Sequence, residues 1–507
     1  MIDIVIFRTK MKGRLHCREV MVITMSKSFI AFILAILCAA SASCARQAQT
    51  EGDANADTTA VETAELVGRE AVSSSVPDTL NFDGETVTIL TRSETGFPEE
   101  FLAEEENGDI INDTVYKRDQ YVTERLNCTT DVITRAGGWG EHVNFMNSVT
   151  GDVMAGDQSY DIISYYAYCA PMLATQNILF NLYDIEHLDL SKPWWHQSFV
   201  ENATVYDKLY HVAGDINLTT VSYRYAIFFN KTLSDIYVED NLYSLVDDGK
   251  WTLDKFLSCV KDIWIDVDGD GISEETDILG WEFGGGYDAI AAGCRFTYTE
   301  KTDDGGYKWN FYTERNNDII EKYFSLKNLE SVFYKDNYTN TASFYNSMRV
   351  FYPSTLNLSD QLRDMRDEYG ILPFPKYDEA QDGYYTTVND NYSQMMIPLT
   401  CKNTELAGAF LELSGEYSYK YLTPAYFEVA MKTKYLRDSD SARMFDIIMD
   451  GASYDFAVIN SSVIGDPVFI TRNSMQEKGG NFASQYASQE AILEAKLEEL
   501  LKTYREE

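Results

Sequence analysis

The stretch that decides the fold lies in the middle of the chain and reads YDKLYHVAGDINLTTVSYRYAIFFNK, from Tyr206 to Lys231. It predicts two strands, because residues 209–212 run into a Gly214–Asp215 turn and residues 221–229 place apolar and aromatic side chains at alternate positions. Asn230 then offers a side-chain oxygen that can cap a following helix. A pair of strands of this kind occurs in any α/β domain, so the flanking sequence has to decide the architecture.

Upstream of this stretch, strands and helices alternate. We expect strands at 86–91, 129–134 and 160–164, and helices at 109–126 and 145–155, from the period of their apolar residues. Strand–helix–strand order indicates a parallel or mixed sheet that is layered by helices.

Downstream, the chain reads as helices interrupted by short strands. Strands are expected at 370–375 and 391–398. The expected helices cover residues 252–265, 317–326, 341–351, 405–413, 426–434, 442–449 and 490–501. The sequence shows no repeat at the period of a solenoid.

The composition is that of a large, acidic, globular protein. The chain has 507 residues, 45% of them hydrophobic, which suffices for two or three domains with a sizeable core. Asp and Glu number 80 against 42 Lys and Arg, and the formal net charge is −38. A surface this acidic repels phosphate backbones and anionic lipid headgroups. We therefore expect no nucleic-acid partner.

A signal peptide is predicted within residues 1–44. A weakly basic start at Met25 leads into the apolar run FIAFILAILCAA (29–40), which is too short to span a bilayer comfortably. Three small residues then precede Cys44, an order that resembles a lipoprotein cleavage box, although Leu or Val is usual where Ser41 stands. We expect lipidation of Cys44. A plain secreted protein that is cleaved nearby is the alternative.

A solvated tether is expected to follow the signal. Residues 45–80 are rich in Ala, Thr, Glu, Ser and Asp and hold no aromatic residue, so the folded part is expected to begin at Asn81. Residues 1–24 precede the signal, and we expect translation to begin at Met21 or Met25.

The cysteines predict neither disulfides nor a zinc cluster. The chain has eight, and after the signal and Cys44 an odd number remains at wide spacing, without any CxxC pair. The remaining residues, which we expect to be buried thiols, are Cys128, Cys169, Cys259, Cys294 and Cys401.

Taken in order, several segments resemble a family 1 extracellular solute-binding protein. They are the box at Cys44, YDIIS (160–164), DKLYHVAGD (207–215), FFNKTL (228–233), GKWTLDKF (249–256), GILPFPKYD (370–378) and the helical tail. The resemblance implies a type II periplasmic-binding-protein fold: two α/β lobes, each a mixed sheet layered by helices, joined by crossing strands around a cleft. It also implies delivery of a ligand to the permease of an ABC importer, and we expect a monomer on the extracellular face of the cell membrane.

This architecture sets the expected domain boundaries. The first lobe is expected over 81–220, and the second over 221–340. The chain is then expected to return to the first lobe over 341–398. The second lobe and a helical tail are expected to complete the chain over 399–507.

The segment DVDGDGISEETD, residues 266–277, has the spacing of a calcium-binding loop. Such loops place carboxylates at alternate positions, then a glycine, a carbonyl ligand and a final carboxylate. The expected ligands are Asp266, Asp268, Asp270, the carbonyl of Ile272, and Asp277. The final Asp, where an EF-hand has Glu, resembles the dockerin version of the loop. We expect a structural Ca²⁺ that braces the second lobe; a solvated acidic turn is the alternative.

The candidate ligand-binding residues are aromatic and polar side chains near expected strand ends and the crossover. Ligands of open α/β sheets bind beyond the carboxyl ends of strands. Flat rings cover the apolar face of a sugar, while Asp, Asn and Arg bond its hydroxyls. The expected residues are Trp139, Tyr165, Tyr166, Trp195, Asp215, Tyr223, Arg224, Trp281, Asn389, Asp390 and Tyr392.

Catalytic motifs are missing from the sequence: it holds no HExxH, no GxSxG and no P-loop. We therefore expect a non-enzymatic receptor for a sugar or oligosaccharide. Two alternatives stay open: a secreted carbohydrate-active hydrolase with a structural calcium, which would need two facing carboxylates, and a binding protein for peptides or another small solute.

Overall fold

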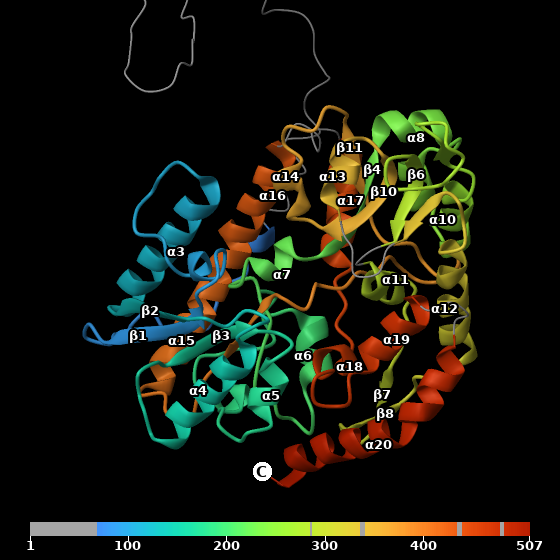
Figure 1. Cartoon of the computed structure of the whole chain (residues 1–507). Coiled ribbons are helices and arrows are strands. Elements are labelled where there is room, and N and C mark those ends of the chain that lie inside the picture. Colours follow the sequence, from blue (N-terminus) through green and yellow to red (C-terminus); the bar gives the residue numbers. More distant parts are fainter. Residues whose placement is uncertain (1–67, 284–285, 335–339, 433–438, 477–480, 507) are drawn as a thin grey trace, which may run out of the picture. The chain divides into compact units, whose positions relative to one another are not determined.

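The computed structural model describes residues 68–283, 286–334, 340–432, 439–476 and 481–506 (Figure 1). The chain divides into a unit of residues 1–68 and a compact unit of residues 69–507, and the two lobes of the protein belong to the second unit. The predicted signal, Cys44 and most of the predicted tether lie outside the described residues. Within the described residues, no helix is both long and apolar enough to span a membrane.

The first sheet has four strands in the order β12-β3-β1-β2. β1 pairs in parallel with β2 and β3, and β12 pairs antiparallel with β3, so the sheet is mixed as predicted. The bounds are β1 Thr86–Arg92, β2 Thr129–Arg135, β3 Ile162–Tyr166 and β12 Ser393–Met396. We call this sheet and the helices that pack on it the first lobe.

Helix α3 (Ile110–Leu126) shows why the first lobe forms where the sequence predicts it. The side chain of Asp109 accepts hydrogen bonds from Ile111 N and Asn112 N and so caps the helix start. Asn127, in the left-handed conformation with φ 47°, ends the helix. The apolar residues spaced along one face are buried, which ties the helix to the core.

The second sheet has the order β11-β4-β10-β6-β5, and β9 also pairs with β6. β4 lies between β10 and β11, and all six of its residues are buried. The bounds are β4 Tyr225–Asn230, β5 Trp264–Ile265, β6 Ile278–Phe283, β9 Val332–Tyr334, β10 Arg349–Thr355 and β11 Tyr369–Leu372. This sheet with its helices is the second lobe, and a separate hairpin pairs β7 (Thr299–Lys301) with β8 (Tyr307–Trp309).

Helices and short turns complete the two lobes. Before the second sheet come η2 Pro98–Glu100, α4 His142–Met154, α5 Ala170–Ala174, η3 Leu182–Asp184, α6 Gln197–Ala203 and α7 Thr219–Ser222. Between its strands lie α8 Lys231–Tyr237, α9 Leu242–Asp247, α10 Leu253–Val260, α11 Tyr287–Gly293, α12 Glu314–Leu326, α13 Thr341–Tyr345 and α14 Leu358–Gln361. The rest is α15 Thr404–Tyr417, η4 Ser418–Leu422, α16 Thr423–Lys432, α17 Ser439–Asp450, α18 Phe456–Ile459, α19 Pro467–Gln476 and α20 Phe482–Glu506.

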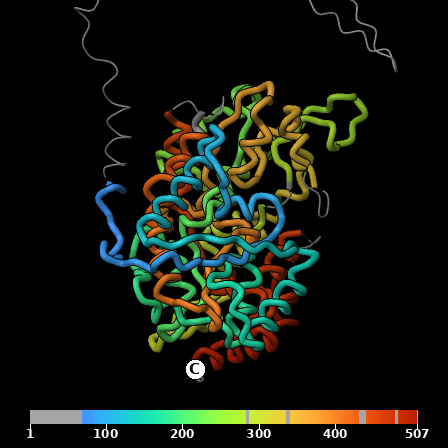
Figure 2. Tube along the Cα trace, turned by 90° about the vertical axis from the view of Figure 1, so that its left-hand side faces the viewer, coloured from blue at the N-terminus to red at the C-terminus, as the bar shows by residue number. Residues whose placement is uncertain are grey.

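Three backbone segments run side by side where the chain passes between the lobes. Figure 2 views the structure from the side of the first lobe, whose blue and teal segments face the viewer. Tyr225 N donates to Thr387 O at 3.1 Å, and Asn389 N donates to Tyr223 O at 2.9 Å. Thr386 forms a parallel bridge with Ala452. We call residues 223–225, 386–389 and 451–453 the crossing segments. They supply the crossing strands that the fold class requires.

The central stretch is built differently from its prediction. Residues 209–212 form no sheet strand; Val212 makes only an isolated bridge to Met395. The predicted strand 221–229 begins as helix α7, and β4 starts only at Tyr225. All residues of α7 and of β4 are buried, so the pattern of apolar residues does not show where the helix ends and the strand begins.

The boundaries beyond residue 340 also need correction. The segments that form β10 and β11 are expected in the first lobe, but both strands pair with β4 in the second sheet. Of the described strands after residue 340, only β12 returns to the first sheet. Helix α15 is expected in the second lobe but packs against α3 and β1. The predicted helix 341–351 stops at Tyr345, because Ser347 adopts φ 60° before β10 begins.

The folded unit begins before the predicted Asn81. Val76 is buried against the core of the first lobe, and its carbonyl accepts a hydrogen bond from Arg125 at 3.3 Å. Lys192 Nζ donates to Ser73 O at 2.9 Å. Residues 69–80 are therefore part of the folded domain.

Candidate ligand-binding site

A pocket lies where the crossing segments meet both lobes. Its cavity volume is about 40 Å³, which has room for a few water molecules. We call it the interlobe pocket. It is lined by Ala167, Tyr168, Asp288, Thr387, Val388, Asp390, Tyr392, Gln394, Tyr454, Val458, Ile459, Ser461, Val468, Phe469 and Arg472.

Aromatic side chains from both lobes stand beside the interlobe pocket. The ring of Trp139 lies 5.5 Å from that of Tyr168 and 6.3 Å from that of Tyr166, in edge-on arrangements. Trp139 is 59% exposed, and Phe469 on α19 is 40% exposed. Each lobe thus offers an exposed aromatic side chain in the neighbourhood of the pocket.

A charged cluster occupies one side of the pocket. Arg472 Nε donates to both carboxylate oxygens of Asp288, at 2.9 and 3.0 Å. Arg472 Nη2 lies 3.5 Å from Asp390 Oδ2, and the side chain of Asp390 is 41% exposed. Desolvation by the surrounding groups raises the pKa of Asp390, and the positive charge of Arg472 offsets only part of this effect. Asp390 thus offers a carboxylate to a hydrogen-bond donor in the pocket.

Two contacts join the lobes across the pocket. Tyr168, which follows β3, donates from its hydroxyl to Asp466 Oδ1 at 3.0 Å, and Asp466 immediately precedes α19. The second contact is the Arg472–Asp390 ion pair, because the loop of Asp390 is held to the first lobe by Arg92. The guanidinium of Arg92 donates to Asn391 Oδ1 at 2.7 Å and to Asn391 O at 2.8 Å.

Tyr454 is held by a buried hydrogen-bond chain. His196 Nδ1 lies 2.8 Å from the Tyr454 hydroxyl, and His196 Nε2 lies 3.1 Å from Asp215 Oδ1. Burial lowers the pKa of His196, although Asp215 hydrogen-bonds to its ring. Tyr454 and Asp215 are both buried.

Tyr392 is held by a second chain of the same kind. His211 Nδ1 lies 2.6 Å from Gln394 Oε1, and Gln394 Nε2 donates to the Tyr392 hydroxyl at 2.7 Å. Burial lowers the pKa of His211 to about 4, so the ring is neutral at pH 7. The rings of Tyr392 and Tyr454 are 6.0 Å apart, so the two tyrosines are neighbours in the lining of the pocket.

No protein-family model matches the chain, and no curated protein matches it either. Solved structures do. The galacto-N-biose-/lacto-N-biose I-binding protein of an ABC transporter from Bifidobacterium longum matches with TM-score 0.54 and 13% identity, over 83% of this chain and 98% of its own. The sugar-binding protein MalE from Xanthomonas citri matches with TM-score 0.53 and 12% identity, over 82% and 98%. The maltose-binding periplasmic protein MalE from Listeria monocytogenes matches with TM-score 0.50 and 12% identity, over 84% and 99%.

The chain therefore shares the two-lobed fold of these sugar-binding proteins. The two-lobed type II periplasmic-binding-protein architecture predicted from the sequence is therefore confirmed at the level of the fold.

In this two-lobed fold, some of the predicted ligand residues do gather at the pocket. Asp390 and Tyr392 line it, and Trp139 and Tyr166 stand beside it. Asn389 lies in a crossing segment, where its side chain donates to Tyr225 Oη at 2.8 Å. The backbone carbonyl of Tyr223 accepts from Asn389 N in the same segment pair. Asp215 reaches the pocket only through His196.

The other predicted ligand residues are core residues. Trp281 is fully buried in the second lobe and packs edge-on against Phe256 at 4.9 Å. Trp195 is fully buried in the first lobe and donates to Glu412 at 3.1 Å. Tyr165 stacks on Phe145, with ring centroids 3.7 Å apart.

Arg224 is buried too, and its guanidinium donates to Thr220 O at 3.1 Å. The prediction that these side chains cover a ligand is corrected, because sequence proximity to a strand end does not show which way a side chain points.

Sequence reasoning missed several pocket residues. They come from the second lobe and the C-terminal part: Asp288, Tyr454, Phe469 and Arg472. No strand end or motif marks these positions, and only the packing of α11, α18 and α19 brings them to the pocket. Tyr168 had a signal, since it lies shortly after the end of the predicted buried strand 160–164.

The predicted calcium loop brings three carboxylates together. Oxygens of Asp266, Asp268 and Asp270 lie within 4.8 Å of one another. A hydrogen bond from Asp270 N lowers the pKa of Asp268, but the combined effect of slight desolvation and the neighbouring negative charges outweighs it and raises the value. Asp277 lies apart from this group: its carboxylate accepts from Trp264 Nε1 at 3.0 Å and from Val267 N at 2.9 Å.

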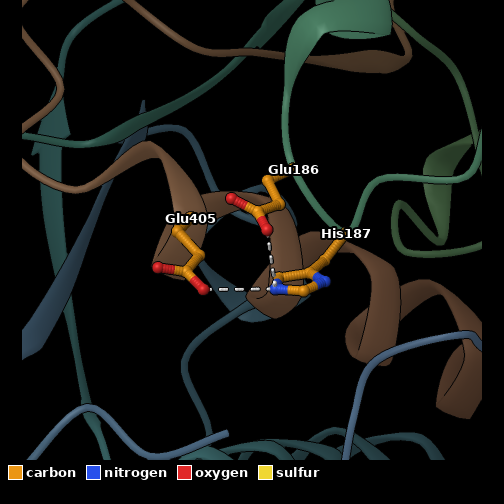
Figure 3. A group of neighbouring side chains, drawn as sticks. All are labelled: Glu186, His187 and Glu405. Atoms are coloured by element: carbon orange, nitrogen blue, oxygen red, sulfur yellow. Dashed lines mark hydrogen bonds and ion pairs between the residues drawn. The ribbon is translucent and has the colours of Figure 1, made fainter.

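A second group of potential metal ligands lies on the first lobe (Figure 3). His187 Nε2 is 3.3 Å from Glu405 Oε1 and 3.9 Å from Glu186 Oε1. Glu405 lies in the first turn of α15, so the contact ties a loop to that helix. A side chain at Gly408 of α15 would collide with the backbone oxygen of Glu186, which shows how closely the loop packs. The arrangement serves the packing of loop on helix.

Proposed function

We propose that the protein is an extracellular receptor that captures a sugar or oligosaccharide in the interlobe pocket and delivers it to an ABC importer. The observation that carries this proposal is the composition of the pocket surroundings. Exposed aromatic rings of Trp139 and Phe469 suit the CH faces of sugar rings. The carboxylate of Asp390 and the hydroxyls of Tyr392 and Tyr454 suit sugar hydroxyls. One fold neighbour is the galacto-N-biose-/lacto-N-biose I-binding protein of an ABC transporter and another is a maltose-binding protein, and both support the same proposal.

The receptor works by hinge closure. A cavity of about 40 Å³ is too small for a sugar ring, so a ligand requires the lobes to part. The crossing segments are the connection about which they rotate. The protein catalyses no reaction: its pocket groups bind and release the ligand intact.

The protein is anchored to the outer face of the cell membrane through lipid on Cys44, and the importer permease is its partner. A structural Ca²⁺ occupies the loop of Asp266, Asp268 and Asp270, with the carbonyl of Ile272 as a further ligand. Three clustered carboxylates fit a hard cation that prefers oxygen. Asp277 closes the loop by accepting hydrogen bonds from its backbone.

Calorimetry over a panel of mono- and oligosaccharides, with amino acids and short peptides as controls, tests the proposal. Binding of at least one saccharide, recovered intact after long incubation, is the expected result. Shortened saccharide would identify a hydrolase instead. Heat of binding with peptides alone would identify a receptor for another class of solute.

A further inference from the structure

Two tyrosines of the interlobe pocket are each backed by a buried histidine. Behind Tyr454 lie His196 and Asp215, and behind Tyr392 lie Gln394 and His211. A hydroxyl can both donate and accept a hydrogen bond, so a tyrosine that is free to rotate its hydroxyl does not distinguish a ligand group that donates from one that accepts. These chains remove that freedom.

The direction of the first chain follows from Asp215. A carboxylate only accepts, so the His196 nitrogen that faces Asp215, Nε2, carries a hydrogen. The burial that lowers the pKa of His196 keeps the ring neutral, so Nδ1 carries no hydrogen and can only accept a hydrogen bond. The Tyr454 hydroxyl therefore donates its hydrogen inward to Nδ1. Towards the pocket, the Tyr454 oxygen can only accept.

The second chain runs the other way. The Gln394 carbonyl oxygen accepts from His211 Nδ1–H, and the Gln394 amide donates to the Tyr392 oxygen. The hydrogen of the Tyr392 hydroxyl is not used in this chain. Towards the pocket, Tyr392 therefore donates.

We propose that His196 with Asp215, and His211 with Gln394, are positioning residues that fix Tyr454 as a hydrogen-bond acceptor and Tyr392 as a hydrogen-bond donor towards the pocket. The pocket then selects a ligand in which one hydroxyl donates to Tyr454 and a neighbouring oxygen accepts from Tyr392. This inference rests on the proposed function. A ligand that lacks the donating hydroxyl leaves the Tyr454 oxygen unpaired in a buried site. Such mismatches cost on the order of tenfold or more in affinity.

A purely structural role of the same residues makes a different prediction. If the histidines only satisfy polar groups in the core, replacing Asp215 would lower stability and leave the ligand preference unchanged. Asp215→Asn separates the two cases, because an amide of the same shape can donate to Nε2. His196 then carries its hydrogen on Nδ1, and the Tyr454 hydroxyl turns to the pocket as a donor.

Nitrogen NMR of the histidine rings, with His196 assigned from the spectrum of His196→Gln, is the first arm of the test and needs no ligand. The wild type should show His196 with hydrogen on Nε2, and Asp215→Asn should move it to Nδ1. Asp161→Asn is the matched control, because Asp161 is also a buried, hydrogen-bonded carboxylate of the first lobe but does not line the pocket. Hydrogen on Nδ1 in the wild type overturns the proposal.

The second arm measures binding of maltose and of each of its monodeoxy analogues. One analogue should bind at least about tenfold more weakly than maltose to the wild type. Tyr454→Phe and Asp215→Asn should abolish that discrimination, while Asp161→Asn keeps it. Unchanged discrimination in Asp215→Asn overturns the inference and leaves the proposed function intact. If neither maltose nor any other saccharide of the calorimetric panel binds, the proposed function fails, and the reading of ligand hydroxyls fails with it.

Discussion

Trp139 and Trp281 show that the surroundings of a residue, and not its type, decide its role. Trp139 is 59% exposed and stands beside the pocket, and its indole stacks on His142 at 4.7 Å. Trp281 is fully buried among the aromatic residues of the second lobe. The sequence suggests both as side chains on which a sugar ring could stack, and only Trp139 has a face that a ligand can reach.

Replacing Trp139 by alanine should weaken saccharide binding with little effect on folding. A ring that stacks on a sugar contributes on the order of 1–3 kcal/mol, so affinity should fall roughly tenfold or more by calorimetry. Trp281→Ala is the comparison: it opens a cavity in the core and should lower the stability of the protein by about 3–5 kcal/mol. Equal saccharide affinity in the wild type and in Trp139→Ala would show that no sugar stacks on Trp139.

Glu412 is a buried carboxylate in the core of the first lobe. It accepts from Trp194 Nε1 at 3.2 Å, from Trp195 Nε1 at 3.1 Å and from Asp189 N at 3.2 Å. Burial raises its pKa to about 7, and these hydrogen bonds offset only part of the effect. The folded state therefore keeps a proton that the unfolded chain has already released.

The contribution of Glu412 to stability should fall as the pH rises from about 4.5 to about 7, because over this range the unfolded state binds fewer protons at Glu412 than the folded state does. A shift of this size corresponds to a loss on the order of 3 kcal/mol. Glu412→Gln should therefore raise the melting temperature at pH 8 and change it little at pH 4. Glu498→Gln, at an exposed carboxylate of α20, is the control. An equal or lower melting temperature of Glu412→Gln at pH 8 would show that the charged form is well accommodated.

At the scale of elements, local signals were reliable where a cap, a periodic pattern and a stop residue agree. Helix α3 has all three and begins and ends as expected, with Asp109 and Asn127 at its ends. The predicted helix 252–265 fails in its last part, since α10 ends at Val260 and Trp264–Ile265 pairs with β6 as β5. Tryptophan and isoleucine occur on apolar helix faces as well as in strands, where they are enriched, and only the sheet partner decides between the two.

The calcium loop is the element whose function can be tested by itself. Calcium should raise the melting temperature of the wild type, because a ligand that binds only the folded state stabilises it by mass action. Asp268→Ala should lose this effect, whereas Asp262→Ala, at an 85% exposed carboxylate just before the loop, should keep it. Identical wild-type melting curves in calcium and in chelator would overturn the proposal.

For the whole molecule, the order of segments predicted two lobes with crossing strands, and the fold comparison confirms this. The assignment of the late segments to lobes failed, because the sequence of a strand does not show its partners: β10 and β11 pair with β4, whereas β12 pairs with β3. Only part of the site could be predicted, again because tertiary partners cannot be read from the sequence. Tyr166 and Asp390 lie near strand ends that the sequence reveals, but Asp288 and Arg472 reach the pocket through tertiary packing.

The predicted lipid on Cys44 should decide where the protein resides. One acyl chain holds a protein only marginally at a membrane, while two or more anchor it stably. Cys44→Ser should therefore move the protein from the membrane pellet to the culture medium, as followed by immunoblotting of both fractions. A wild-type protein that is already wholly in the medium would refute the anchor.

Opening and closing of the lobes is the remaining prediction for the whole molecule. The contacts of Tyr168 with Asp466 and of Arg472 with Asp390 join the two lobes in the described conformation, and both must break for a sugar to enter. Small-angle scattering should therefore give a larger radius of gyration for the saccharide-free protein than for the protein saturated with a saccharide that binds by calorimetry.

Asp466→Ala removes one closing contact, so the saccharide-free protein should be at least as expanded as the wild type. Its saccharide affinity should fall, because a smaller fraction of molecules populates the closed state. An unchanged radius on addition of a bound saccharide would show that the ligand enters without movement of the lobes.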